Sequence, residues 1–197
     1  MMKLRVVAVI LFLSLFVTSC ESDNHNNGLC CAGTITDIAS QQESLTTLVS
    51  ALQATGLDSA LTGDGYYTVL APTNDAFDAF LASINATSID DIPVNLLTNV
   101  LLNHVITGNL ESNSLDNGYV NTQAVSDASN TNISIYINTD NGVNFNGVSN
   151  VITADVVATN GVIHVVDSVI GLPTVVTFAL ADPNFEILVQ ALTRDDL

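Results

Sequence analysis

Two stretches of this chain decide its fold: TVLAPTNDAF at residues 68–77, and NGVIHVVD at residues 160–167, which runs on to Pro173. Each contains a short apolar run rich in β-branched residues, which predicts a buried strand. Pro72 ends the first strand, because proline cannot continue a ladder of hydrogen bonds. Asn160-Gly161 predicts a turn in which the glycine adopts a positive φ.

The first half of the chain has the periodicity of amphipathic helices. Thr73 or Asn74 can cap a helix that carries Asp75 in its first turn, near the positive end of the helix dipole. Gly56 is expected to end the helix before it, and Gly108 the helix after it. The buried faces of the three helices are predicted to be Leu45, Leu48, Val49 and Leu52; Phe77, Phe80 and Leu81; and Leu96, Leu97, Val100, Leu101, His104 and Val105.

The second half of the chain has a period of two. Isoleucines over residues 133–137 alternate with polar residues, and Asn141-Gly142 predicts a tight turn before the alternation resumes. A further apolar run over residues 151–157 turns back into the run over residues 162–170. Helices in the first half and hairpins in the second half predict an α+β fold.

The two deciding stretches together resemble the two signature motifs of the fasciclin I-type domain. LLNHV at residues 101–105 is similar to the central helix motif of that family, and Thr122-Gln123 is similar to its mid-domain Thr-Gln step. The resemblance covers residues 34–173. It implies a β-wedge of hairpins with helices packed from the N-terminal half, acting as an extracellular adhesion or binding module without chemistry of its own.

The resemblance also implies which residues matter, either for folding or for binding. These family-motif residues are Thr68, Asn74, Asp75, Phe77, His104, Asn160, Gly161, His164, Asp167 and Pro173. Animal members carry a Tyr-His pair implicated in integrin contact in the central motif, but this chain has Asn103 at the tyrosine position. We therefore carry over a structural role for His104 and no integrin recognition.

The N-terminus predicts a secretory signal over residues 1–19. Two basic residues precede an apolar run over residues 6–17, which is shorter than the roughly 20 residues of a membrane span. Residues 17–20, Val-Thr-Ser-Cys, resemble a bacterial lipobox, which implies lipidation of Cys20 and an anchor in the cell envelope. Glu21 favours the outer membrane and exposure at its surface. The alternative is an ordinary signal peptide cut nearby, with Cys20 lost or left free.

Residues 20–33 are predicted to form a flexible tether, because they are too polar and glycine-bearing to pack a core. Cys30 and Cys31 are adjacent in it, and in an oxidising envelope they can cross-link to another chain or, with strain, to each other. With His25 alone beside them, they make a weak metal site.

Residues 174–197 predict the start of a second, truncated fasciclin-like repeat. The sequence of residues 48–52, Leu-Val-Ser-Ala-Leu, recurs 140 positions later as Leu-Val-Gln-Ala-Leu at residues 188–192. At the same shift Leu45 meets Phe185. Too little of the repeat is present to close a second core. The alternative is a C-terminal helix that packs on the first domain.

The composition is acidic, with 20 Asp and Glu residues against three Lys and Arg residues, and residues 34–173 contain no Lys or Arg. This argues against nucleic acid and anionic lipid headgroups as partners, because both need cationic contacts. Loose association of Ca²⁺ with the surface is expected to relieve charge repulsion. Asp64 and Asp140 lie in glycine-bearing loops, either as Ca²⁺ ligands or, the interpretation we favour, as solvated turn carboxylates.

No catalytic motif or cofactor fingerprint is present, which predicts that the chain is not an enzyme and uses no cofactor. His164 and Asp167 suggest a catalytic dyad, but residues three apart on a strand point to opposite faces. We therefore interpret His164 as a structural histidine, satisfied by its neighbours.

The sequence supports two functional hypotheses. The first is a lipid-anchored cell-surface module that mediates contact with extracellular matrix, polysaccharide or other cells. The second is a periplasm-facing envelope accessory that binds a soluble carbohydrate or another small ligand in a cleft.

Overall fold

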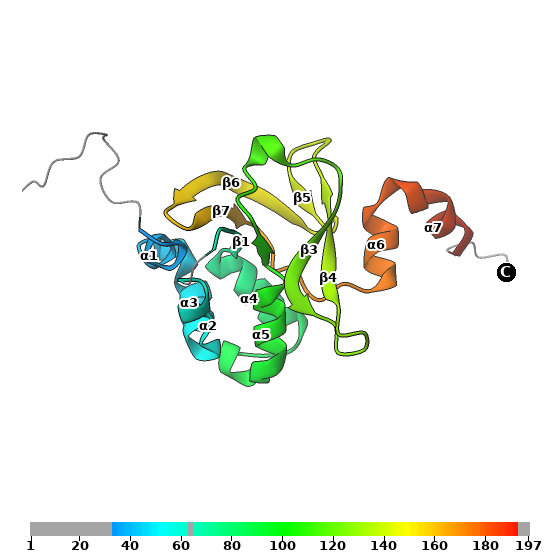
Figure 1. Ribbon diagram of the computed structural model, residues 1–197. Coiled ribbons are helices and arrows are strands. Elements are labelled where there is room, and N and C mark those ends of the chain that lie inside the picture. Colours follow the sequence, from blue (N-terminus) through cyan, green and yellow to red (C-terminus); the bar gives the residue numbers. More distant parts are fainter. Residues whose placement is uncertain (1–32, 63–64, 193–197) are drawn as a thin grey trace, which may run out of the picture. The chain divides into compact units, whose positions relative to one another are not determined.

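The computed structural model describes residues 33–62 and 65–192 (Figure 1). The predicted signal, residues 20–32 of the predicted tether with its cysteines, and Asp64 lie outside these residues. The helices are α1 (Ile35–Ser40), α2 (Thr46–Thr55), α3 (Leu57–Ala60), α4 (Asn74–Ser83), α5 (Val94–Leu102), α6 (Val175–Ala181) and α7 (Glu186–Leu192), with short 3₁₀ turns η1 (Glu43–Leu45), η2 (Ile89–Asp91), η3 (Ser112–Ser114) and η4 (Pro183–Phe185). None of the helices within the described ranges is both long and apolar enough to cross a bilayer.

The strands form one closed barrel in sequence order. They are β1 (Tyr67–Pro72), β2 (Val105–Thr107), β3 (Gly118–Val125), β4 (Asn132–Asn138), β5 (Asn144–Phe145), β6 (Ser149–Ala158) and β7 (Gly161–Val166). Successive strands pair antiparallel, and a parallel pairing of β1 with β7 closes the barrel. Figure 1 shows α2, α4 and α5 gathered at one end of this barrel. The expected α+β fold, with a wedge of hairpins and helices from the N-terminal half, is confirmed.

The barrel and the helices enclose two apolar clusters. The larger cluster lies between the helices and the β1–β7 seam, and Leu45, Phe77 and Ile163 are each at most 1 % exposed in it. The smaller cluster fills the barrel around Ile135, Ile137 and Phe145. β1 serves both clusters, because Val69 faces the first and Leu70 the second, as the alternation of side chains along a strand requires.

The helix termini follow local capping chemistry. Thr73 caps α4, and its hydroxyl oxygen accepts a hydrogen bond from the backbone N–H of Ala76 at 3.2 Å. Gly56 ends α2 in the left-handed conformation at φ 70°, as its position in the sequence predicts.

One sequence prediction about the helix after Pro93 is wrong. The helix ends at Leu102, so His104 lies in the turn that follows and Val105–Thr107 form β2 instead of a further helical turn. The cause is tertiary, because Val105 and Ile106 are buried in a strand that pairs with β1. In the same seam, the N–H of Leu70 donates to the carbonyl oxygen of His104 at 2.9 Å.

The parallel seam of β1 and β7 depends on Gly161. Tyr67 pairs with Gly161 at the start of the ladder, and Gly161 has φ 150°, the positive value that the sequence predicts. A Cβ atom on Gly161 would lie 1.8 Å from the carbonyl oxygen of Tyr67. No side chain fits there unless the two strands separate.

We expect Gly161→Ala to lower the free energy of unfolding by at least about 2 kcal/mol, because it combines a left-handed φ with a backbone clash. Gly142→Ala is the matched control: Gly142 also has a positive φ, 94°, but open space around its Cβ position. It should cost only about 1 kcal/mol. Urea denaturation of both variants measures the difference, and equal losses would contradict the role given to Tyr67.

Candidate functional site

The polar residues of the two signature stretches bond to the backbone of neighbouring segments. Thr68 is buried; its hydroxyl donates to the carbonyl oxygen of Gly108 at 2.8 Å and accepts from the N–H of Leu110 at 2.9 Å. It therefore fixes the loop after β2 against β1.

Asn74 ties the start of α4 to the start of α2. Its side-chain oxygen accepts from the N–H of Thr47 at 3.0 Å, and its side-chain nitrogen donates to the carbonyl oxygen of Glu43 at 2.9 Å. Leu45, at the cap position of α2, has no side-chain hydrogen bond of that kind, so Asn74 supplies the cap from another helix. Asp75 is exposed in the first turn of α4, and Phe77 is buried in the larger apolar cluster.

Asn160 has the same role at the other end of the seam. Its side-chain oxygen accepts from the N–H of Ile35 at 2.9 Å, and its side-chain nitrogen donates to the carbonyl oxygen of Leu61. The turn before β7 therefore holds both the start of α1 and the end of α3.

His104 is fully enclosed and both of its ring nitrogens have partners. Nδ1 lies 2.8 Å from the carbonyl oxygen of Val100, to which it donates, and Nε2 accepts from the N–H of Ile170 at 2.9 Å. Burial lowers the pKa of His104 from 6.5 to about 4, and the bond to Val100 only partly opposes this. The imidazole is neutral at physiological pH and joins α5 to the segment after β7.

Asn103 stands beside His104 and is also buried. Its side-chain nitrogen donates to the carbonyl oxygens of Ile170 at 3.2 Å and Gly171 at 3.1 Å, and its side-chain oxygen accepts from the hydroxyl of Thr122 at 3.2 Å. The Thr-Gln step therefore meets the central motif in space.

His164 and Asp167 have separate partners and form no dyad. His164 is buried, with Nε2 2.8 Å from the carbonyl oxygen of Leu110 and Nδ1 accepting from the N–H of Asp155 at 3.3 Å. Asp167 accepts from the backbone and side-chain nitrogens of Asn150 at 2.8 and 2.9 Å. Partial burial alone would raise the pKa of the Asp167 carboxyl, but hydrogen bonds from Asn150, Ser168 and its own backbone together lower the pKa.

The structure thus brings most of the motif residues together along the β1–β7 seam and engages them in internal contacts. Pro173 lies between β7 and α6, in the segment that leaves the barrel. Asp140 accepts from the side-chain nitrogen of Asn117 at 2.8 Å. Within the described residues, no three His, Cys, Asp or Glu side chains group closely enough to hold a metal ion.

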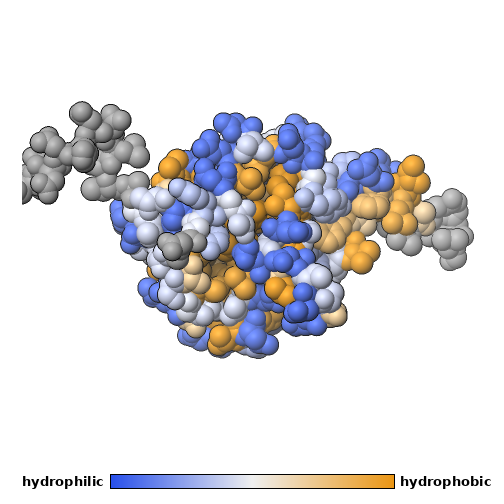
Figure 2. Space-filling view, in the orientation of Figure 1, coloured by the Kyte–Doolittle hydropathy of each residue, from blue (hydrophilic) through white to orange (hydrophobic). Residues whose placement is uncertain are grey.

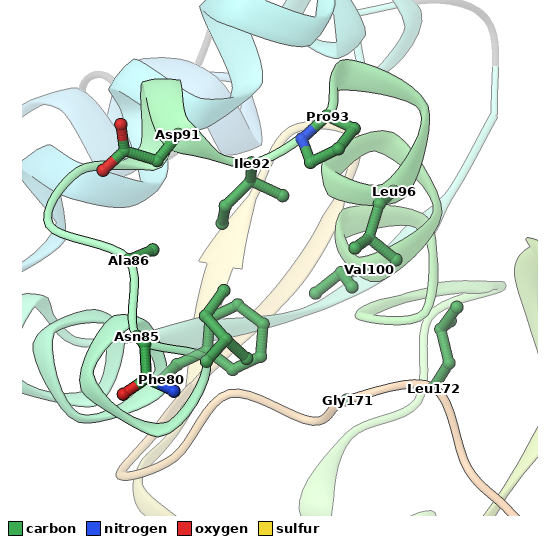
Figure 3. Close-up of a pocket in the computed structure, with 11 residues that line it drawn as sticks. Phe80, Asn85, Ala86, Asp91, Ile92, Pro93, Leu96, Val100, Gly171 and Leu172 are labelled. Atoms are coloured by element: carbon green, nitrogen blue, oxygen red, sulfur yellow. The ribbon is translucent and has the colours of Figure 1, made fainter.

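An open cavity of about 480 Å³ lies between α4, η2, α5 and the segment after β7. Its walls are mainly apolar, and we name it the α4–α5 groove after its two helices. The lining residues are Phe80, Ile84, Asn85, Ala86, Asp91, Ile92, Pro93, Leu96, Val100, Gly171 and Leu172 (Figure 3).

The groove is shaped by the short turn η2. Ser88 and Asp91 form a capping box around it, and the Asp91 carboxylate also accepts from the N–H of Thr87 at 2.8 Å. Hydrogen bonds from Thr87 and Ser88 lower the pKa of that carboxyl. Figure 3 shows Ile92 pointing into the groove and the Asp91 carboxylate turned away from it. The groove therefore offers carbon surface rather than charge.

Two large aliphatic side chains at the groove are substantially exposed: Ile84 at 43 % and Leu96 at 42 %. The sequence prediction assigned Leu96 to a buried helix face and did not find the groove. Helical spacing gave no signal for this, because adjacent positions can share a buried face, as Val100 and Leu101 do at 3 % and 2 % exposed. Leu97, next to the exposed Leu96, is buried as well.

Comparison with known proteins identifies the family. The sequence model of the fasciclin domain matches residues 43–173. The chain is 36 % identical over 139 residues to protein sll1483 of Synechocystis, covering 71 % of this chain and 73 % of that protein. It is 30 % identical over 136 residues to pig transforming growth factor-beta-induced protein ig-h3, covering 69 % of this chain but only 19 % of that much longer protein.

Human periostin is 30 % identical over 130 residues, with 66 % of this chain and 15 % of periostin covered. Among solved structures, a FAS1 domain pair from the insect cell adhesion molecule fasciclin I matches with a TM-score of 0.42 and 24 % identity, over 77 % of this chain and 51 % of that one.

The buried His104 predicts acid sensitivity. The unfolded chain binds a proton on this histidine near pH 6.5, whereas the folded chain resists protonation down to about pH 4. The stabilisation is therefore complete above pH 6.5 and declines as the pH falls toward 4, by roughly 3 kcal/mol from this group.

Chemical denaturation of the wild type and of His104→Gln between pH 7 and pH 4 measures this effect. The variant is less stable at pH 7, but its stability should fall less steeply as the pH decreases. Parallel pH profiles for the two proteins would contradict the assignment.

Proposed function

This chain belongs to the fasciclin domain family, and we propose that it is a lipid-anchored adhesion module of a bacterial cell surface, not an enzyme. In this proposal, Cys20 carries the lipid and the outer membrane displays the domain. The partner is extracellular matrix, a glycan or a protein on another cell.

The α4–α5 groove is the observation that carries this proposal. Most polar motif residues bond within the domain, whereas Ile84 and Leu96 expose apolar surface beside a cavity. Exposed aliphatic residues around a cavity are typical of a binding site. We infer that the groove takes an aliphatic side chain of a partner protein or the apolar face of a sugar ring.

The domain is acidic, so a partner without excess negative charge would meet the least electrostatic repulsion. Residues 34–173 contain no Lys or Arg that could pair with acidic groups. Recognition then rests on apolar contact and hydrogen bonds, with Ca²⁺ loosely bridging carboxylates where the partner is acidic.

The state of the two buried histidines favours binding over catalysis. In both His104 and His164, one ring nitrogen bonds to a backbone carbonyl oxygen and the other accepts from a backbone N–H. A general base needs a ring nitrogen within reach of substrate, and these two serve the fold instead.

The second candidate function uses the same groove for a soluble ligand in the periplasm. A volume of about 480 Å³ is within the usual range for small-molecule sites. Protease treatment of intact cells separates the two candidates. Loss of the domain while a periplasmic control survives supports surface adhesion, and protection of both supports the periplasmic ligand.

We expect the double substitution Ile84→Ser, Leu96→Ser to reduce cell adhesion at least about tenfold, because the groove loses its apolar rim. Both side chains are already partly exposed, so the free energy of unfolding should fall by no more than about 2 kcal/mol. Val157→Ser on β6 is the matched control, since Val157 is 59 % exposed and does not line the groove.

The assay compares attachment of cells that display equal amounts of each variant. Unchanged attachment of the Ile84, Leu96 variant, or an equal loss in the Val157 variant, would contradict the groove as the binding site.

A further inference from the structure

The helices at the C-terminal end of the described chain repeat those at its start, element by element. Moving α1, η1 and α2 by 140 positions gives the starting residues of α6, η4 and α7: Val175, Pro183 and Glu186. Thr34 caps α1 and Thr174 caps α6, each with a capping box to the residue three positions on. The repeat predicted from the sequence thus extends to local backbone structure. We call α1–η1–α2 the leading module and α6–η4–α7 its copy.

The two modules differ in what covers their apolar faces. In the leading module Ile35, Leu45 and Leu48 are at most 2 % exposed, because the larger apolar cluster encloses them. At the equivalent positions of the copy, Val175 is 83 %, Phe185 39 % and Leu188 46 % exposed. Figure 2 shows the apolar surface over α6 and α7. The copy therefore carries apolar side chains at the positions that are buried in the leading module, but no apolar cluster encloses them among the described residues.

The first domain holds its leading module through the larger apolar cluster and through hydrogen bonds to backbone groups of the module. Asn160 bonds to the N–H of Ile35, and Asn74 bonds to the carbonyl of Glu43 and the N–H of Thr47. The hydrogen bonds place few demands on the side chains of the module, whereas the cluster requires apolar residues at the positions of Ile35, Leu45 and Leu48. A second core of the same family would hold the copy in the same way.

The copy contacts the first domain through residues that differ from those at the equivalent positions of the leading module. The hydroxyl of Tyr119 on β3 donates to the carboxylate of Asp182 at 2.8 Å. The rings of Tyr119 and Phe178 meet edge-on, with 5.6 Å between centroids. In the leading module the corresponding residues are Ile38 and Gln42, and Gln42 makes no side-chain cap.

Two further contacts close this attachment. Tyr136 on β4 supports the ring of Tyr119, with 5.1 Å between centroids. A Cβ on Gly147 would lie 3.3 Å from the Cα of Ala181, so the turn between β5 and β6 approaches the end of α6 closely. Asp182 is only 4 % exposed, and it also accepts from the N–H of Asn184 at 2.9 Å as the cap of η4.

We propose that residues 174–192 are the leading module of a second fasciclin-type domain on the same polypeptide, and that Tyr119, Phe178 and Asp182 form the joint that fixes the two domains. The partner of the exposed face is the core of that second domain. A second copy of this chain is a poorer partner, because its core is already covered by its own leading module.

A fixed joint has a consequence for recognition. Two domains that turn together present their binding surfaces in one relative orientation, and simultaneous engagement of one partner then raises the effective concentration of the second contact. A flexible linker between the two domains would not set that orientation.

A transplant within this chain tests the module. Residues 174–192 replace residues 34–52, with Phe185→Leu in the transplanted segment because the equivalent Leu45 is fully buried and a larger ring would overpack the site. The hybrid should unfold cooperatively in urea. A second hybrid with Val175→Asp and Leu188→Asp should not fold.

Two half-transplants, into residues 34–42 and into residues 43–52, accompany the full one. Loss of cooperative unfolding in all three hybrids would overturn the proposal, as would equal stability of the hybrid that carries the aspartates. Light scattering of the intact chain measures whether it forms a dimer. If the wild type is a dimer and Leu188→Asp makes it a monomer, the exposed face binds a second copy of this chain, and the proposal is overturned.

Hydrogen exchange in the intact chain tests the joint. A helix of seven residues is not stable in isolation, so protection of the α6 amides requires docking. Tyr119→Phe should accelerate their exchange about tenfold, because Asp182 loses a hydrogen bond. Tyr66→Phe is the matched control on an exposed tyrosine. Unprotected α6 amides in the wild type, or equal exchange in both variants, would overturn the joint.

Discussion

The fold depends on the parallel contact between β1 and β7, which brings the two signature stretches side by side. Gly161 permits this contact, because the carbonyl oxygen of Tyr67 occupies the place of a Cβ. Every other strand pairs antiparallel with its neighbour in sequence, so this seam alone closes the barrel from its two ends. The seam also supplies one wall of the larger apolar cluster, against which the helices pack.

Around this seam, polar side chains complete the backbone hydrogen bonding of a loop and of two helix starts. Thr68 satisfies the loop after β2, Asn74 the start of α2, and Asn160 the start of α1. Removing one such side chain leaves a partly buried N–H without its partner, which costs more than the bond itself contributes. This asymmetry explains why short polar residues mark the motif in a domain that is otherwise held by apolar packing.

Sequence reasoning was most successful where the signal is local. The periodicity of α2 and α4, the Thr73 cap and the positive φ of Gly161 follow from rules that act within a few residues. It was wrong where distant pairing overrides local pattern: Val105 continues the helical periodicity of α5, but β1 takes it as a strand partner. The groove could not be predicted, because its walls come from α4, η2, α5 and the segment after β7, and no short stretch records their meeting.

The residues that make this family recognisable are therefore different from those proposed to choose a partner. Thr68, His104 and His164 are buried and bond within the domain, so substitutions there change stability before they change recognition. Ile84 and Leu96 are 43 % and 42 % exposed, so substitutions there are expected to cost less stability than substitutions at the buried motif residues. A scaffold of this kind can acquire new partners by changing its exposed aliphatic residues and new domain orientations by changing the joint, while the β1–β7 seam stays constant.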